Sequence, residues 1–354
     1  MATTTNYNCS AKMAADIGKW LFGGGTGWTV AGCANTDFNG EYVFTGIRND
    51  GTGYYSPYFS DGAGHYLYRS LNVIGTADWR LSTTLGTNAT YTSSVYTAYN
   101  IMGLPSTWPG GITLSALGVI AAPTQPGTWT LHLLTSAASA TSKGTEVSVA
   151  GYAAQSVTAV TNTATIDFGL PSETWGTITG ALLQDGEDAD RYLYFNVTPG
   201  VLTAANFRVI VPTGGLTETG IGDWNAAIST VVTTWLFGVA PTRPAYWTLD
   251  LRFTVEGLAY PKPAPQPAGL AAKNATTDPG IYWNAAIADY GTAPQDWGTC
   301  TGWRCFPMHI PYSISGEPAY TIFDTFASPM TLIEGQDVYW PANGFVVDLL
   351  NPPS

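Results

Sequence analysis

The sequence predicts a mainly β protein: two antiparallel β-sandwich repeats, each preceded by a short helix, with a small β-module inserted into the first repeat. Three observations lead to this fold class. Only 11% of the 354 residues are charged, against about 25% in an average soluble protein. Thr, Tyr, Trp, Gly and Pro take their place, and these residues favour strands and turns. Apolar residues alternate along short segments, and three blocks of sequence recur in the same order.

The recurring blocks define the repeat. The matched pairs are Pro123–Leu133 with Pro241–Leu251, Ala150–Gln155 with Ala268–Lys273, and Thr174–Gly180 with Asp296–Gly302. The first two pairs share one offset and the third has a larger one, so the second copy carries about four extra residues in one loop. We therefore expect a duplicated domain with a scaffold of four tryptophans, which are Trp129, Trp175, Trp247 and Trp297.

Each copy is expected to begin with a short helix. Apolar residues recur at helical spacing over Ala11–Phe22 and again from about Asp223 to Phe237. Both segments end in Trp-Leu-Phe-Gly. Glycine directly after a helical run is the usual C-terminal stop, so both helices should end at this shared sequence.

A long gap in the first copy indicates an insertion. About a hundred residues separate Gly23 from Pro123, far more than in the second copy. Asn-Gly and Asp-Gly steps between alternating aromatic residues predict hairpins, so we expect four or five short strands in a small, outward-facing sheet. The expected domains are residues 1–25 with 110–220 for the first repeat, 26–109 for the insert, and 221–354 for the second, diverged repeat.

Within each repeat, a strand runs through the block that contains Trp129 or Trp247, where apolar and polar residues alternate. Further strands are expected at Thr165–Phe168, Trp175–Gln184, Arg191–Asn196 and Ala205–Val211, with counterparts in the second copy. Seven or eight short strands per repeat are typical of an antiparallel sandwich. The proline-rich stretch 260–267 predicts a stiff loop inside the second copy.

Charge and hydropathy exclude several functions. A net charge of −12 with 13 scattered basic residues does not fit nucleic-acid binding, which needs clustered Lys and Arg. No apolar run reaches the roughly 20 residues that span a bilayer. The N-terminus lacks the pattern of a signal peptide, so we expect synthesis in a cytoplasm.

The motifs of the first copy resemble those of a known family. Gly144-Thr145-Glu146-Val147-Ser148, then Gly151-Tyr152-Ala153, and later Trp175-Gly176-Thr177-Ile178-Thr179 follow the Thr-x-Pro…Trp strand. In this order they resemble small bacteriophage proteins described as tail fibre proteins. The second copy lacks the Gly-Thr-Glu-Val-Ser element, and the insert is similar to a short β-repeat of surface and phage proteins. The resemblance implies a virion component that is made in the bacterial host cytoplasm and has other virion proteins as partners. It also implies a homo-oligomer, with a trimer favoured.

Candidate chemical groups are few. The histidines, which are His65, His132 and His309, lie in no catalytic motif, so we expect no enzyme, no cofactor and no catalytic or metal site. The acidic run 185–190 has two interpretations, a solvated turn or a calcium loop, and the turn is preferred because the run lacks a full calcium-loop pattern. Cys300 and Cys305 are either buried thiols, the preferred interpretation, or a hairpin disulfide.

Aromatic residues of the insert suggest a contact surface. The set is Tyr54, Tyr55, Tyr58, Tyr66, Tyr68 and Trp79. Exposed, these rings would form a platform on which the sugars of host polysaccharides stack. The alternative, preferred here, is that a domain of about 80 residues needs them for its own core.

Three functions follow from the sequence. The first is a structural protein of a tailed phage, in a tail fibre, collar or baseplate-proximal appendage, that acts by assembly. The second is a capsid decoration or cement protein. The third is a carbohydrate-binding module that recognises host glycans through the insert, and it is compatible with the first.

Overall fold

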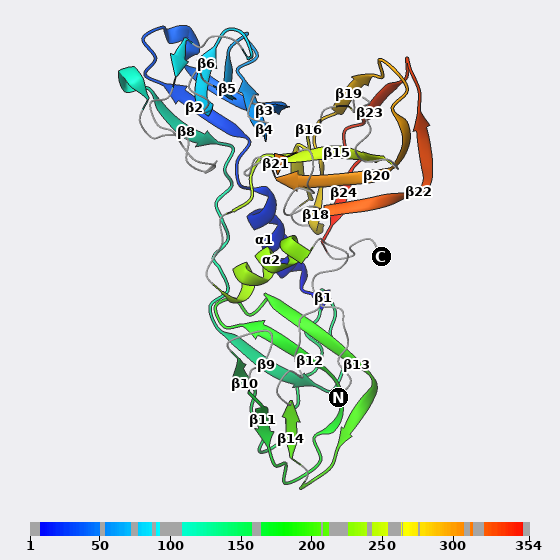
Figure 1. Cartoon of the computed structure of the whole chain (residues 1–354). Helices are drawn as coiled ribbons and strands as arrows, with labels where there is room; N and C mark the ends of the chain where they lie inside the picture. The colour runs from blue at the N-terminus through cyan, green and yellow to red at the C-terminus, as the bar shows by residue number, and fades with distance from the viewer. Residues whose placement is uncertain are drawn as a thin grey trace.

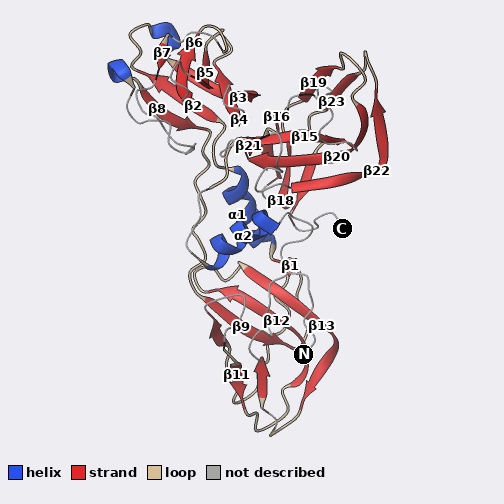
Figure 2. Cartoon of the chain, in the orientation of Figure 1, coloured by secondary structure: helices blue, strands red, loops and turns tan. Residues whose placement is uncertain are grey.

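The structure is a computed structural model of the whole chain. It describes residues 8–49, 54–71, 77–86, 90–92, 108–157, 164–206, 208–211, 226–238, 243–253, 263, 265–274, 277–307, 312–313 and 322–349. Strands dominate these residues, with two α-helices, which confirms the mainly β class (Figure 2). Figure 1 shows three β regions arranged around the two helices, which lie at the waist of the molecule.

The first β unit lies below the helices in Figure 1. Its main sheet has the strand order β1-β13-β12-β9-β10. These strands are β1 (Asn8–Cys9), β9 (Trp129–Leu134), β10 (Gln155–Val157), β12 (Gly176–Asp185) and β13 (Tyr192–Thr203). A two-stranded sheet of β11 (Ile166–Gly169) and β14 (Val209–Val211) packs against it through buried side chains of one shared core.

The second β unit lies on the other side of the helices. Its main sheet has the order β16-β15-β20-β22, from β15 (Trp247–Phe253), β16 (Gln266–Pro267), β20 (Gly298–Pro307) and β22 (Ile322–Leu332). Two smaller sheets complete it. They are formed by β17 (Leu270–Asn274), β18 (Asp278–Asn284) and β24 (Val346–Asp348), and by β19 (Ala288–Thr292) and β23 (Asp337–Trp340).

The two units have the same strand registers. In the first unit, Trp129 lies opposite Asp185, and the β12–β13 pairing shifts between Ile178 and Gly180. In the second, Trp247 lies opposite Pro307, and the β20–β22 pairing shifts between Cys300 and Gly302. The list of matched positions is Trp129 with Trp247, Asp185 with Pro307, Ile178 with Cys300 and Gly180 with Gly302. A bulge is a specific local device, so its recurrence at matched positions supports the duplication inferred from the sequence.

The small sheets match as well. In both β11 and β19 the register shifts at an Asp-x-Gly step, Asp167 to Gly169 and Asp289 to Gly291. In both, the aspartate Oδ1 accepts a hydrogen bond from the glycine N–H, at 2.9 and 2.8 Å. A local side-chain bond of this kind stabilises the bend, and the identical device again relates the two units.

One sequence block is not matched in space. Gln155 lies opposite Leu131 on β9, whereas on β15 the residue opposite Leu249 is Gln266. The strand that pairs at Gln266 therefore comes seven residues earlier than the alignment of Ala150–Gln155 with Ala268–Lys273 predicts. The sequence match is real, but the second unit reaches its edge by a different connection.

The N-terminal sheet forms the third β region and has the order β7-β6-β5-β4-β3-β2-β8. Its strands are β2 (Gly27–Ala31), β3 (Gly40–Asn49), β4 (Tyr54–Ser60), β5 (Tyr66–Leu71), β6 (Ala77–Ser82), β7 (Tyr91–Thr92) and β8 (Thr113–Leu117). Short 3-10 turns lie at Thr36–Phe38 and Pro109–Gly111. Six of these strands lie within residues 26–109, more than the expected four or five, and β8 extends the sheet beyond residue 109. It also receives β21 (Tyr312–Ser313) of the second unit, which pairs with β4.

The N-terminal sheet packs on the second unit, which corrects the expectation that the insert simply faces outward. Tyr246 is 4% exposed and contacts the rings of Trp28, Phe44 and Phe59. Phe306 is fully buried in the same core. The matched residues of the first unit are Thr128, which is exposed, and Gln184, which is half-buried. Two polar-to-aromatic differences thus give one copy alone an apolar surface for the N-terminal sheet.

Candidate functional site

The two helices join the β units. Helix α1 (Ala11–Phe22) begins after Ser10, whose Oγ accepts a hydrogen bond from Met13 N (3.1 Å). It ends at Gly23, whose N–H donates to Lys19 O (3.1 Å). Helix α2 (Ala226–Phe237) ends in the same way at Gly238, whose N–H donates to Thr234 O (2.8 Å). Both helices therefore end at Trp-Leu-Phe-Gly as predicted, with C-terminal carbonyl groups that need partners.

Two of the scaffold tryptophans, Trp129 and Trp247, each bind the helix that precedes the other unit. Trp129 Nε1 of the first unit donates to Leu236 O at the end of α2 (3.2 Å). Trp247 Nε1 of the second unit donates to Leu21 O at the end of α1 (2.9 Å). Leu21 and Leu236 occupy the same position of the two helices, so the exchange is reciprocal. Each unit thus satisfies a helix carbonyl group that the other unit leaves open.

A second matched pair of residues makes the same exchange. Gln125 Nε2 donates to Gly238 O (2.5 Å). Arg243, which takes its place in the second copy, donates from Nε to Trp20 O (2.7 Å) and from the guanidinium ends to Lys19 O and Ile120 O. A cation at the C-terminus of α1 also complements the helix dipole. This pair could have been noticed in the sequence, because Gln125 and Arg243 are the residues that differ within the otherwise matched Pro-Thr-x-Pro blocks.

Equivalent aromatic residues meet at the centre of the junction. Trp20 of α1 and Trp235 of α2 stack with ring centroids 5.6 Å apart and planes 20° apart. Phe22 packs on Trp247 (5.0 Å), and Phe237 packs on Trp129 (4.8 Å). Contact between equivalent residues is the mark of a two-fold interface. The junction therefore has the form of a symmetric dimer interface within one chain.

Close packing fixes α1 on the second unit. A Cβ on Gly18 would lie 2.1 Å from Tyr282 Cε2, and a Cβ on Gly280 would lie 2.7 Å from Ala14 Cβ. Gly280 also has φ +80°, which disfavours other residues. Burial, with a smaller contribution from Asp16, raises the pKa of Tyr282 to about 12. Helix and sheet approach closely here because both surfaces carry glycine.

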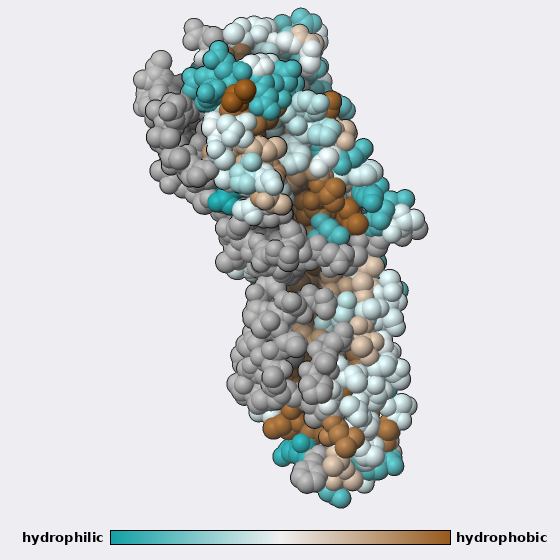
Figure 3. Space-filling model, turned by 90° about the vertical axis from the view of Figure 1, so that its right-hand side faces the viewer, coloured by the Kyte–Doolittle hydropathy of each residue, from teal (hydrophilic) through white to brown (hydrophobic). Residues whose placement is uncertain are grey.

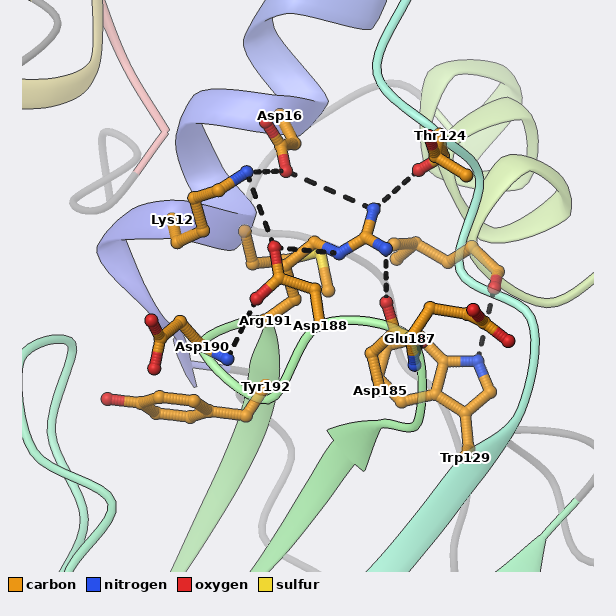
Figure 4. A network of polar contacts seen from close by, with 12 residues as sticks. Lys12, Asp16, Thr124, Trp129, Asp185, Glu187, Asp188, Asp190, Arg191 and Tyr192 are labelled. Atoms are coloured by element: carbon orange, nitrogen blue, oxygen red, sulfur yellow. Dashed lines mark hydrogen bonds and ion pairs between the residues drawn. The ribbon is translucent and has the colours of Figure 1, made fainter.

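A buried charge network fixes the other end of α1 to the first unit (Figure 4). Arg191 Nη2 lies 2.5 Å from Asp185 Oδ2, Nε lies 3.8 Å from Asp188, and Nη1 lies 3.9 Å from Asp16 of the helix. The side chains of Arg191, Asp185 and Asp16 are 4%, 0% and 4% exposed. Arg191 also donates to Thr124 O (2.5 Å). A buried charge is stable only when it is paired in this way.

The acidic run is therefore a docking site for α1. Lys12 contacts Asp16 and lies 3.7 Å from Asp188, and Ser10 Oγ donates to Asp190 O (2.7 Å). Glu187 and Asp190 of the run are exposed, in line with a turn, but Asp185 at its beginning is buried. Among the residues that the structure describes, no group of three or more His, Cys, Asp or Glu side chains is placed to hold a metal ion. The network around Arg191 is the part that sequence reasoning missed.

Comparison with known families identifies part of this assembly. Residues 114–200 match the model of the family described as Podophage GP4 fiber I protein gp80. This segment is therefore similar to a phage fibre family. No curated protein and no solved structure matches the chain. The fibre-family segment includes β9 to β12 and most of β13, together with Gln125, Trp129 and Arg191. It therefore carries the first unit's half of the helix junction.

Outside the fibre-family segment, the predicted aromatic set is divided between the two faces of the N-terminal sheet. Trp79 is 4% exposed and belongs to the core that contacts Tyr246. Tyr68 is fully buried on the opposite face, beneath the guanidinium of Arg48, 5.2 Å from the ring centroid. Tyr58 and Tyr66 are half-buried on that same face. Tyr54 and Tyr55 lie in β4, but their side chains are outside the described residues. Sugar binding by this set stays a prediction.

The four scaffold tryptophans are all buried. Trp129 and Trp175 are each 2% exposed, and Trp247 and Trp297 are 5% and 7% exposed. The Nε1 atoms of Trp175 and Trp297, matched residues of the two units, both lack a hydrogen-bond partner in the described structure. They act in the cores, whereas Trp129 and Trp247 also bind the helices.

The cysteines and histidines are placed as follows. Cys300 and Cys305 are free thiols in one strand, β20. Five residues of strand span about 16 Å, too far for a disulfide, which excludes the hairpin bridge. His132 Nδ1 lies 2.7 Å from Glu146 Oε1, and His65 Nδ1 lies 2.5 Å from Asp61 Oδ2. His309 is outside the described residues.

Proposed function

We propose that this protein is a structural component of a tailed phage virion, in a tail fibre, collar or baseplate-proximal appendage, where it acts by assembly and without catalysis. The fibre-family match of residues 114–200 carries this proposal. The junction supports it, because one core contains buried residues of both helices and both β units. A continuous core of this kind suits a stiff connector between virion proteins.

The surface also suits a protein covered by neighbours. Only 11% of the residues are charged, and Figure 3 shows apolar side chains gathered at the lower end, where the first unit lies. The exposed large apolar residues of that unit include Leu170, Leu202 and Ile210, at 61%, 71% and 41% exposure. Exposed apolar patches of this kind often mark contacts with other proteins.

Mass spectrometry of purified, salt-washed particles tests the proposal. The chain should be present at a fixed ratio to the other appendage proteins, in a few dozen copies or fewer per particle. Hundreds of copies per particle would instead support the capsid decoration protein. Absence from washed particles that retain their appendages would contradict both.

A second function, recognition of host polysaccharides, has one observation in its favour. Tyr58 and Tyr66 are half-exposed neighbours on one face of the N-terminal sheet, and burial together with Tyr66 raises the pKa of Tyr58. Aromatic pairs at this exposure can stack on sugar rings and keep their hydroxyl groups in water. Binding of the full chain to a polysaccharide array should be lost in Tyr66→Ala. It should persist in Tyr339→Ala, which removes a ring that is 56% exposed on the second unit. No binding by the wild-type chain would contradict this function.

A further inference from the structure

Strand β8 forms one end of the N-terminal sheet. It pairs with β2 over five successive residue pairs, from Gly27 opposite Leu117 to Ala31 opposite Thr113, with no shift of register. Its other edge pairs with no strand among the described residues. In Figure 1 it lies at the outer margin of the molecule, and the chain continues from it along that margin to the first unit. The edge is therefore straight and on the outside.

The edge is also uncharged and exposed. Residues 109–124 contain no Asp, Glu, Lys or Arg. Thr113, Ser115 and Ala116 of the strand are exposed. Directly after it, Val119 and Ile120 are 49% and 52% exposed. An exposed, regular, uncharged strand edge is a template for pairing with another strand.

The other strands at the ends of the described main sheets carry features that oppose such pairing. β1, β7 and β16 have two residues each, β16 includes Pro267, and β10 has three residues. β22 is long, but it contains Asp324, Pro329 and a shift of register. Short length, proline, charge and bulges are the usual protections of an edge. Of these end strands, β8 alone lacks all four.

We propose that the edge of β8 pairs in antiparallel fashion with β8 of a second copy of this chain, about a two-fold axis. Each chain has a net charge of −12, so two copies repel over most of their surfaces. The uncharged ribbon 109–124 is where that repulsion is least. Antiparallel pairing of a strand with itself satisfies the open backbone groups of both copies.

This inference rests on the proposed function, because it describes one contact through which the chain would assemble. A two-fold contact makes dimers or other even-numbered assemblies, whereas the sequence favoured a trimer. The mass of the assembly therefore distinguishes a dimer from a trimer. If the chain occurs in particles but does not self-associate through β8, the virion role stands and this inference fails.

Ser115→Lys in the full chain is the decisive variant. Ser115 is the middle residue of β8, so two-fold pairing would place the two lysines close together, and opposed like charges weaken strand pairing. The matched control is Thr92→Lys on β7, which is an exposed residue at the opposite end of the same sheet. Sedimentation velocity of the three proteins from about 1 to 100 μM should show wild type and T92K as dimers. The dissociation constant of S115K should be raised at least about tenfold.

Three results would overturn the inference: a wild-type chain that stays a monomer or forms a trimer, an S115K chain that dimerises like wild type, or equal loss in T92K. Circular dichroism establishes that both variants are folded. Oxidative cross-linking gives a second measurement. With Cys9→Ser as background, Ser115→Cys should form covalent dimers at a rate that Thr92→Cys does not match.

Discussion

Arg191 shows what one residue contributes at the junction. It is the cation that faces Asp185, Asp188 and Asp16, and all but Asp188 are nearly or fully buried. Buried ion pairs seldom stabilise more than apolar residues would, but loss of one partner leaves an uncompensated charge. Arg191 therefore contributes specificity more than stability, because only the acidic run and the first turns of α1 together pair its charge.

Arg191→Ala should lower the free energy of unfolding by about 3–5 kcal/mol, because Asp185 would remain buried without its cation. Urea unfolding followed by tryptophan fluorescence measures the change. The matched control is Arg208→Ala, which removes an ion pair with Asp167 at an exposed site and should have little effect. Equal effects of the two substitutions would contradict the role given to the buried network.

Asp61 gives a pH prediction at the same scale. Although burial favours its neutral form, hydrogen bonds from His65 and Ala63 hold the pKa of Asp61 below the usual 3.8. A carboxylate with a lowered folded-state pKa contributes stability above its unfolded pKa, and this is lost as the pH falls through the folded value. Asp61→Asn should therefore lower the melting temperature at pH 6 and change it much less near pH 2. An equal loss at both pH values would contradict the assignment.

At the scale of elements, propensity and packing oppose each other in α1. Gly18 weakens an isolated helix by up to about 1 kcal/mol relative to alanine. Its Cα faces the ring of Tyr282, however, with no room for a methyl group. Packing therefore requires glycine at position 18, and α1 approaches β18 more closely than a residue with a side chain would allow.

Gly18→Ala should consequently destabilise the chain, by about 1–3 kcal/mol of overpacking, although it improves helix propensity. Gly18→Ala combined with Tyr282→Ala should be less destabilised than the sum of the two single variants, because the truncated side chain makes room. Denaturant unfolding of all four proteins measures this coupling. Stabilisation by Gly18→Ala alone would show that α1 does not pack on β18 in this way.

At the scale of the whole molecule, the reciprocal binding of helix ends makes each β unit depend on the other. Trp129 and Trp247 each hold a helix that belongs, in sequence, to the opposite copy. The buried core runs without interruption from the first unit through both helices into the second. Two units that share one core should unfold together rather than in two steps.

Thiol labelling of Cys305 tests this coupling across the molecule. Cys305 is fully buried in the second unit, and burial raises the pKa of its thiol. In a background of Cys9→Ser, Cys33→Ser and Cys300→Ala, Trp129→Phe removes a hydrogen bond worth about 1 kcal/mol from the first unit. It should speed the labelling of Cys305 about fivefold, because exposure follows global unfolding. An unchanged rate, with the first unit measurably destabilised, would show independent units.

Much of this architecture could be predicted from local pattern. The helix ends at Trp-Leu-Phe-Gly, the strands at Trp129 and Trp247, and the mainly β class follow from periodicity and turn residues. Burial of Trp79 agrees with the preferred core interpretation of that residue. Arg191 could not be recognised as a junction residue, because its contacts with Asp16 and Thr124 join segments far apart in the sequence and charge alone does not show burial.

The recurring blocks, the helix ends and the Trp strands are local patterns of apolar and turn residues, so they can be recognised along the chain. How the two β units are combined depends on contacts between segments that are far apart in the sequence. Each Trp strand holds the opposite helix, and the N-terminal sheet rests on Tyr246 and Phe306 of the second unit. A helix C-terminus carries carbonyl acceptors that need hydrogen-bond donors, and an apolar face needs to be covered. The sequence shows which helix ends and apolar faces need partners, but not which distant segment supplies them.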